Sequence, residues 1–221
     1  MNRNRLLCTA GALAGPLFIV ATAAQIATRD GFDLSRHAIS MLGLGEYGWI
    51  QVTTFIVTGV LIGAAALGAR RALHPGRAGT WAPALLGVTA AGLVAAGVFT
   101  PDGGYGFPAG APEGMPEHFS WHAILHTVAA LLAFVSLIAA TFVLARGFAS
   151  RGLRGWAAAS VVTGVALLPL FLWPSQDGAG VRLAIGGYLG FAWVSAVSAR
   201  LGAAPAQVPV APSMRWRSRS A

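Results

Sequence analysis

Residues 121–145 read WHAILHTVAALLAFVSLIAATFVLA, and this run contains no Asp, Glu, Lys or Arg. An α-helix rises 1.5 Å per residue, so about 20 apolar residues cross the roughly 30 Å of bilayer hydrocarbon. A charge at the centre of such a helix would cost at least about 2.5–3.5 kcal/mol on insertion scales. The stretch therefore predicts a transmembrane helix and places the chain among the membrane proteins.

Five more stretches of this kind lie on either side of it. They are equally free of Asp, Glu and Arg and cover residues 6–28, 49–69, 81–100, 155–173 and 183–199. Only 10% of the 221 residues are charged, whereas soluble domains carry about 25%. We predict an all-α integral membrane protein whose residues 1–202 form one bundle of six transmembrane helices. The Ala-, Pro- and Arg-rich remainder, 203–221, is predicted to be a disordered basic tail.

The arginines predict the orientation of the bundle. All 15 basic residues are arginine, and 12 of them lie at the termini or in the segments on the same side as the termini. The other side holds three, Arg29, Arg36 and Arg182, together with all seven acidic residues. Basic residues stay in the cytoplasm, so we predict that both termini are cytoplasmic.

The first span has a second interpretation. Arg3 and Arg5 followed by an apolar run and by Ala21-Thr22-Ala23 resemble a cleaved secretory signal. The apolar run continues to about Thr28, which is long enough to cross the bilayer. We expect the span to be retained, and cleavage would leave five spans in the same orientation.

The partners implied by this composition are lipids. We expect the bilayer to cover the spans and anionic lipids to bind the arginines of the cytoplasmic loops and tail. The net charge of +8 does not indicate nucleic-acid binding, because the arginines lie in short segments between apolar runs. The glycine pairs 11/15, 59/63 and 186/190 predict close helix packing within the monomer. The oligomeric state is left open.

Polar residues concentrate in two outer segments. Residues 29–48 read RDGFDLSRHAISMLGLGEYG, and we expect a short helix there from Asp33 or Ser35 to about Leu42. Residues 101–120 read PDGGYGFPAGAPEGMPEHFS, whose glycines and prolines predict irregular structure up to the fourth span. Functional chemistry is therefore expected at this outer face.

The fourth span opens with histidines four residues apart, at His118, His122 and His126. Residues four apart share a helix face, and two such histidines can bind one zinc ion. Asp102 lies at a level suited to complete a site with His122 and His126. His37 and Ser40 are expected to fold over the same mouth. A hydrogen-bonded structural cluster of the same five residues, or another role, is the alternative to a metal.

These residues carry a family resemblance. The motifs are HAISMLGLGEYGWIQ at residues 37–51, FTPD at 99–102 and WHAILH at 121–126. Together they resemble the bacterial membrane proteins grouped as domain of unknown function 998, most closely the actinobacterial members. The resemblance spans about residues 6–199 and implies six spans in a bacterial plasma membrane, with no established activity. Family members usually have Pro-x-Asp where this chain has Thr-Pro-Asp102.

A remoter similarity is to the superfamily of alkaline ceramidases and adiponectin receptors. Those seven-span proteins bind zinc through membrane histidines that include a His-xxx-His pair, with Asp and Ser nearby. This chain has similar residue types in His37, Ser40, Asp102, His122 and His126. Its six predicted spans and its Ser–His spacing differ, so the comparison serves only as an analogy.

Two functions follow as hypotheses. In the first, the polar His/Asp cluster at the extracytoplasmic face organises the loops and binds a lipid or a partner protein. In the second, His122, His126 and Asp102 hold zinc, which activates water to hydrolyse a lipid ester or amide. Export of small molecules is disfavoured, because no span carries a buried acid or arginine.

Overall fold

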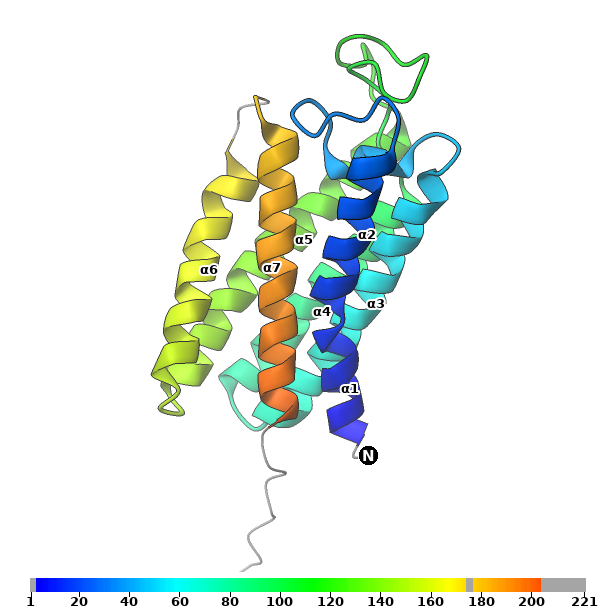
Figure 1. Cartoon of the computed structure of the whole chain (residues 1–221). Coiled ribbons are helices and arrows are strands. Elements are labelled where there is room, and N and C mark those ends of the chain that lie inside the picture. Colours follow the sequence, from blue (N-terminus) through cyan, green and yellow to red (C-terminus); the bar gives the residue numbers. More distant parts are fainter. Residues whose placement is uncertain (1–2, 174–176, 204–221) are drawn as a thin grey trace, which may run out of the picture.

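The computed structural model describes residues 3–173 and 177–203, and within them the chain is helical with no β-strand. Most of the helices run side by side in alternating directions (Figure 1). Seven α-helices and one 3₁₀ helix follow one another: α1 Arg3–Ala12, α2 Ala14–Thr28, η1 Ile39–Gly43, α3 Gly48–Leu73, α4 Arg77–Val98, α5 Trp121–Ala149, α6 Arg154–Leu172 and α7 Ala179–Gly202.

Six helical segments are long and apolar enough to cross a membrane, because α1 and α2 together form one span, Arg3–Thr28. This confirms the predicted six-span, all-helical membrane fold. The helices extend beyond most of the predicted spans: α3 includes Arg70 and Arg71, and α5 includes Arg146. Composition marks where the hydrocarbon ends, whereas backbone hydrogen bonds continue the helix into the polar interface.

The break between α1 and α2 lies at Leu13, three residues before Pro16. The backbone N–H of Gly15 donates instead to the Ser195 hydroxyl of α7, at 2.8 Å. A neighbouring helix thus satisfies a backbone group that the break sets free. Thr22, within the alternative cleavage motif, is fully buried and its hydroxyl lies 3.0 Å from that of Tyr188. The first span is therefore packed as an integral part of the bundle.

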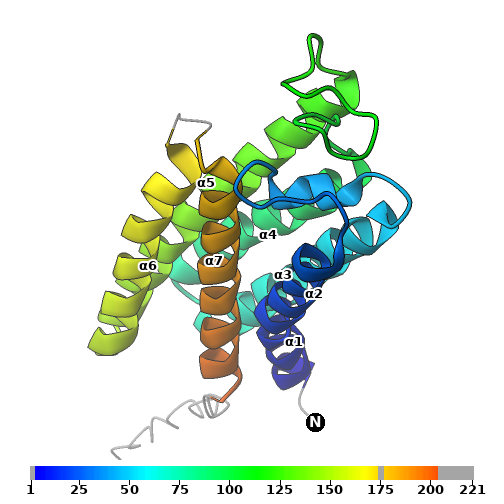
Figure 2. The same ribbon diagram turned by 45° about the horizontal axis from the view of Figure 1, so that its top comes forward.

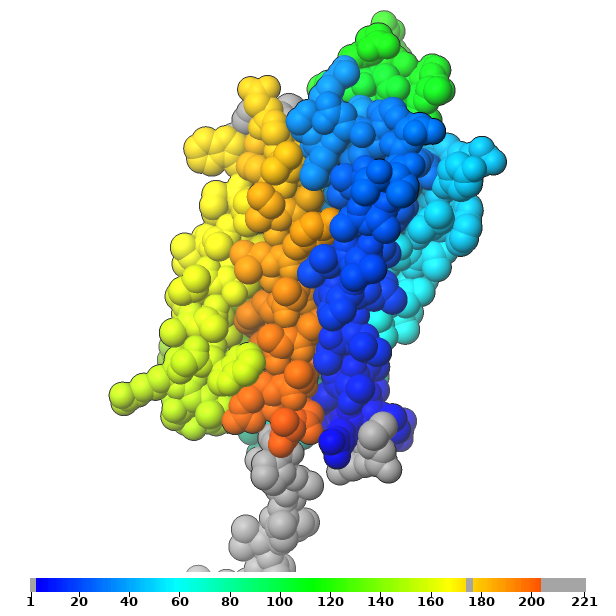
Figure 3. All heavy atoms as spheres, in the orientation of Figure 1, coloured from blue at the N-terminus to red at the C-terminus, as the bar shows by residue number. Residues whose placement is uncertain are grey.

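The helices form a ring in which α3 packs on α4, α4 on α5, α5 on α6 and α6 on α7, while α1 and α2 contact both α3 and α7. Figure 3 shows the closely fitted face where α1 and α2 lie against α7. Small residues make these contacts close: a Cβ on Gly15 would lie 2.7 Å from the Phe191 carbonyl oxygen, and one on Gly59 would lie 2.8 Å from that of Ala90. Gly63 differs, because a Cβ at this position would make only ordinary van der Waals contact.

The two ends of the bundle differ in charge. The end with Arg3 and Gly202 is called here the terminal end, and the opposite end is the loop end (Figure 1). The terminal end carries most of the described arginines, whereas Arg29, Arg36 and Arg182 lie at the loop end. The asymmetry predicted from the sequence is thus built into the fold. The tail beyond residue 203 lies outside the described residues.

Two segments cover the loop end. The first does not form the helix expected from Asp33 to Leu42. Its residues 33–37 form a turn, because the Asp33 carboxylate accepts hydrogen bonds from the N–H and hydroxyl of Ser35, at 2.8 and 2.7 Å. These bonds lower the pKa of the Asp33 carboxyl. After the turn comes η1, which lies across the loop end of the bundle (Figure 2). The second segment, 100–120, is irregular as predicted.

Candidate functional site

A pocket of about 850 Å³ lies at the loop end. Its walls come from α2, α3, α4, α5, α6 and α7, and the two loop segments contribute to it as well. We call it the loop-end pocket. The residues used below are among those that line it: Phe18, Arg36, Ser40, Phe55, Asp102, His126, Ala130, Leu131, Phe134, Phe171, Trp173, Arg182 and Phe191.

The pocket has an aromatic floor, which we define as Phe18, Phe55, Phe134, Phe171 and Phe191. The rings of Phe134 and Phe171 stack with centroids 4.0 Å apart and planes at 7°. The Phe18 ring meets that of Phe191 edge-on at 4.7 Å. A Cβ on Gly186 would lie 2.4 Å from the Phe171 ring. The glycine therefore leaves the room that Phe171 occupies, and the floor is wholly apolar.

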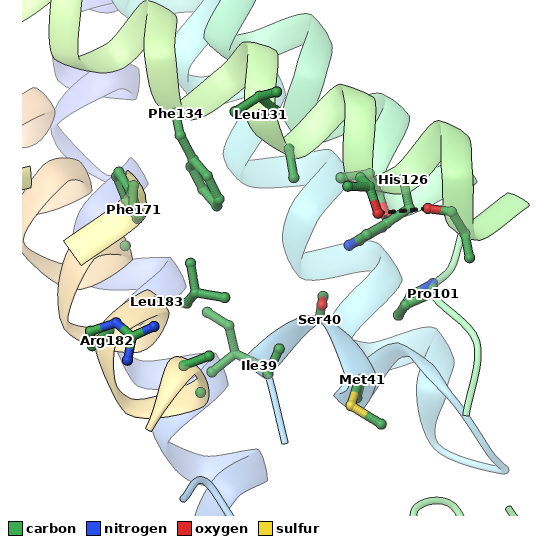
Figure 4. Close-up of a pocket in the computed structure, with 18 of the residues that line it drawn as sticks. Ile39, Ser40, Met41, Pro101, His126, Leu131, Phe134, Phe171, Arg182 and Leu183 are labelled. Carbon is green, nitrogen blue, oxygen red and sulfur yellow. Dashed lines mark hydrogen bonds between the residues drawn. The ribbon is translucent and has the colours of Figure 1, made fainter. Parts of the chain in front are cut away.

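His126 supplies a polar group to the opposite side of this pocket (Figure 4). Its side chain is 7% exposed, and its Nδ1 lies 3.0 Å from the Ala96 carbonyl oxygen and 2.8 Å from that of Phe99. Carbonyl oxygens only accept hydrogen bonds, so Nδ1 carries the proton. His126 thereby satisfies carbonyls at the end of α4, and Nε2 is left as the acceptor of a neutral ring.

Ser40 reaches the same pocket from η1 (Figure 4). The flanking side chains Ile39 and Met41 are 7% and 8% exposed, and Leu42 is fully buried. These apolar anchors hold the short helix against the bundle, which fixes the position of the Ser40 hydroxyl. Two of the predicted site residues, His126 and Ser40, thus line one cavity from different elements.

Asp102 also lines the pocket, but its carboxylate is engaged in holding the start of α5. Its two oxygens accept hydrogen bonds from the backbone N–H and the hydroxyl of Ser120, at 2.7 and 2.6 Å. The Ser120 oxygen in turn accepts the N–H of Ala123, at 3.2 Å, and so caps the helix. The negative charge of a carboxylate at the N-terminus of α5 also interacts favourably with the helix dipole. Asp102 therefore orients the helix that carries His126.

His37 does not line the pocket. It is 2% exposed, its Nδ1 accepts the backbone N–H of Asp33 at 2.9 Å, and its Nε2 lies 3.0 Å from the Tyr105 carbonyl oxygen. Because one nitrogen accepts, the other donates to that carbonyl. The ring also lies 5.3–5.4 Å from those of Phe107 and Phe32. His37 therefore joins the two loop segments, and both of its nitrogens are used.

His122 differs from His126 in its exposure. Its side chain is exposed, and its ring lies 3.7 Å from that of Trp121. His118 lies exposed in the loop before α5. No three His, Cys, Asp or Glu side chains in residues 3–173 and 177–203 are grouped as a metal ion requires. The arrangement gives no support to a zinc site of His122, His126 and Asp102, which stays a prediction.

The aromatic floor and the two arginines of the pocket wall were not among the site residues predicted from the sequence. Arg36 lies exposed in the first loop segment, and Arg182 in α7 donates to the Asp177 carbonyl oxygen. Both belong to the three arginines on the acidic side of the chain, and that rarity was a usable signal. The phenylalanines gave none, because aromatic residues inside apolar spans are ordinary.

The comparisons with known proteins concern the family. A family model described as "Protein of unknown function (DUF998)" matches residues 12–200, which is most of the chain. No curated protein matches the chain, and no solved structure matches it. The matched region contains all five predicted site residues and the whole loop-end pocket.

Proposed function

The chain belongs to the DUF998 family of proteins of unknown function, and from that premise we propose that it binds a lipid-like amphiphile in the loop-end pocket. The observation that carries the proposal is the pocket itself, with about 850 Å³ of space, an aromatic floor and a lining that is mostly apolar. Sites for small ligands are usually concave, mostly apolar and about 300–1,000 Å³ in volume. The pocket has the size and chemistry of such a site.

The walls of the pocket favour a ligand that comes from the bilayer. Leu131 of α5 and Trp173, just after α6, both line the pocket and are 52% and 62% exposed. The pocket therefore continues to the apolar surface of the spans, where acyl chains would lie. A ligand entering there would place its apolar part on the aromatic floor, and its polar part would meet Ser40 and His126.

The charge asymmetry of the two ends supports an orientation of the pocket relative to the membrane. Basic loops are retained in the cytoplasm, so we propose that the terminal end is cytoplasmic and that its arginines rest on anionic lipid headgroups. The loop-end pocket then faces the extracytoplasmic side of a bacterial plasma membrane. The outer leaflet, or a carrier that approaches it, would supply the ligand.

A pair of tryptophan variants on α5 tests the proposal. Ala130 lines the pocket, whereas Leu132 lies two positions further on, is 53% exposed and does not line it. Ala130→Trp puts an indole into the cavity, and Leu132→Trp puts the same group on the outer surface of the same helix. The measurement is the amount of diacylglycerol retained by protein taken from lipid nanodiscs, determined by native mass spectrometry.

We expect Ala130→Trp to retain about fivefold less diacylglycerol than the wild type, and Leu132→Trp to retain as much as the wild type. A difference of this size corresponds to about 1 kcal/mol of binding free energy. Equal retention by both variants would contradict the proposal, because binding would then depend on the outer surface of the spans and not on the pocket.

A further inference from the structure

His126 has one nitrogen that the fold does not use. Nδ1 donates to two carbonyl oxygens, at 3.0 and 2.8 Å, so Nε2 carries a lone pair. Nε2 has no protein hydrogen bond within the described residues, the side chain is 93% buried, and the ring lines the loop-end pocket. Nε2 is accessible from the pocket, and an acceptor of this kind without a protein partner is free to bond to a ligand.

We infer that the ligand of the loop-end pocket carries a hydroxyl group in its headgroup, and that His126 Nε2 accepts the hydrogen bond from this hydroxyl. The inference rests on the proposed function and specifies the chemistry of the ligand. An acceptor nitrogen selects a headgroup with a hydrogen-bond donor. It disfavours an ester, an ether or an ionised phosphate at the same place, because their oxygens only accept hydrogen bonds.

Ser40 supports a hydroxyl as the group that is recognised. Its side chain lines the same pocket and has no hydrogen bond within the described residues. A serine hydroxyl both donates and accepts. A ligand hydroxyl that lay between the two side chains would donate to His126 and accept from Ser40, and both of the unused polar groups would then be satisfied.

The distribution of charge in the pocket favours a neutral headgroup at His126. Figure 4 shows Arg182 on the side of Leu183 and Phe171, while His126 lies with Pro101 on the other side. Arg36 lies on the exposed loop. The carboxylate that lines the pocket near the start of α5, Asp102, would repel an anion. Diacylglycerol, whose headgroup is one free hydroxyl, has the chemistry that these groups select.

The test compares three probes with the same acyl chains: diacylglycerol, its 3-O-acetyl ester, and phosphatidate. The central variant is His126→Asn, because an asparagine amide nitrogen can take the place of Nδ1 and keep the bonds to the α4 carbonyls while Nε2 is lost. Ser40→Ala is the second variant. Affinities are measured by titration into nanodisc-reconstituted protein, and folding is checked by thermal unfolding of each variant.

For the wild type we expect diacylglycerol to bind about tenfold more tightly than the acetyl ester, the size of one hydrogen bond to a buried partner. In His126→Asn this ratio should fall to about one, with binding of the ester unchanged. In Ser40→Ala it should fall about threefold, and this variant decides the matter if His126→Asn does not fold.

Three results would overturn the inference: equal binding of diacylglycerol and its ester by the wild type, tighter binding of phosphatidate, or an unchanged ratio in folded His126→Asn. In each of these the pocket still binds an amphiphile, so the proposed function stands. If none of the three probes binds the wild type, the proposed function fails together with the inference. The two claims are therefore separable in one experiment.

Discussion

The terminal end and the loop end are built from the same helices, but the loop end holds a large cavity lined by aromatic rings. At the terminal end small residues bring the helices together: a Cβ on Gly11 would lie 2.6 Å from the Ala65 Cβ, and one on Gly202 would lie 2.8 Å from the Cys8 Cβ. At the loop end, large rings such as Phe134 and Phe171 line a cavity. Close glycine contacts also occur at the loop end, because a Cβ on Gly92 would lie 2.6 Å from the Ala129 carbonyl oxygen. The large cavity, and not the helix contacts, is therefore what distinguishes the loop end.

The polar groups follow the same division. Near the middle of the bundle, buried hydroxyls serve neighbouring backbone or ring groups, as Ser195 does for Gly15 and Ser160 for the Trp193 indole, at 3.1 Å. At the loop end, His126 and Ser40 line the pocket with polar atoms that the described residues leave unbonded. A binding site in a membrane bundle is therefore indicated by unbonded polar atoms that open onto a cavity. The buried Thr58 hydroxyl also has no hydrogen bond within the described residues, but Thr58 does not line the pocket.

The variant with the largest expected effect disturbs the close helix packing at the terminal end. Gly11→Ala places a methyl group within 2.9 Å of the Ala65 backbone, which cannot move cheaply. We expect a loss of about 2 kcal/mol in unfolding free energy, the usual cost of overpacking, seen as a lower midpoint of thermal unfolding in detergent.

The matched control is Gly87→Ala, because nothing lies within 4 Å of a Cβ at that position. Its stability should be equal to or slightly above that of the wild type, since alanine favours the helix. Equal stability of the two variants would show that the terminal end is not closed by backbone contact.

A smaller effect is expected from loosening the loop end. His37→Phe keeps a ring between Phe32 and Phe107 but removes the hydrogen bonds to Asp33 and Tyr105. We expect a loss of about 1–2 kcal/mol and faster hydrogen exchange at the amides of residues 104–107, with the spans unchanged.

The comparison for this variant is His122→Phe, because His122 is exposed and its ring lies beside those of Trp121 and Phe99. Its effect on unfolding free energy should stay within about 0.5 kcal/mol, as is usual for surface positions. If His122→Phe were as damaging as His37→Phe, the distinct roles that the structure gives these two histidines would be wrong.

The number of spans was predictable because hydrocarbon tolerates so few sequences. Residues 121–145 have no charge and must be either buried or in lipid, and the arginines mark the helix ends. The break at Leu13 lies three residues before Pro16, but the hydrogen bond from Gly15 to Ser195 could not be predicted. Ser195 lies 180 residues from Gly15 in the sequence, and the hydrogen bond between them forms because α2 packs against α7.

The candidate site was predictable only in part. His126 and Asp102 both line the loop-end pocket, and their similar depth follows from their positions near helix ends in the sequence. The expected pairing of His126 with His122 depended on spacing alone, and spacing does not determine that His122 packs on Trp121. His37 was expected at the mouth, and its role as a link between loops required the fold of both segments.

The most direct test of the account is to map where a lipid touches the protein. A diacylglycerol with a photoactivatable group in its acyl chain is crosslinked in nanodiscs, and the labelled residues of α5 are identified by mass spectrometry. The account predicts that labelling concentrates on Leu131 and Phe134, which line the pocket, and that excess unlabelled diacylglycerol suppresses it. Labelling spread equally over the outward-facing Leu132 and Val135, and insensitive to competitor, would contradict the account.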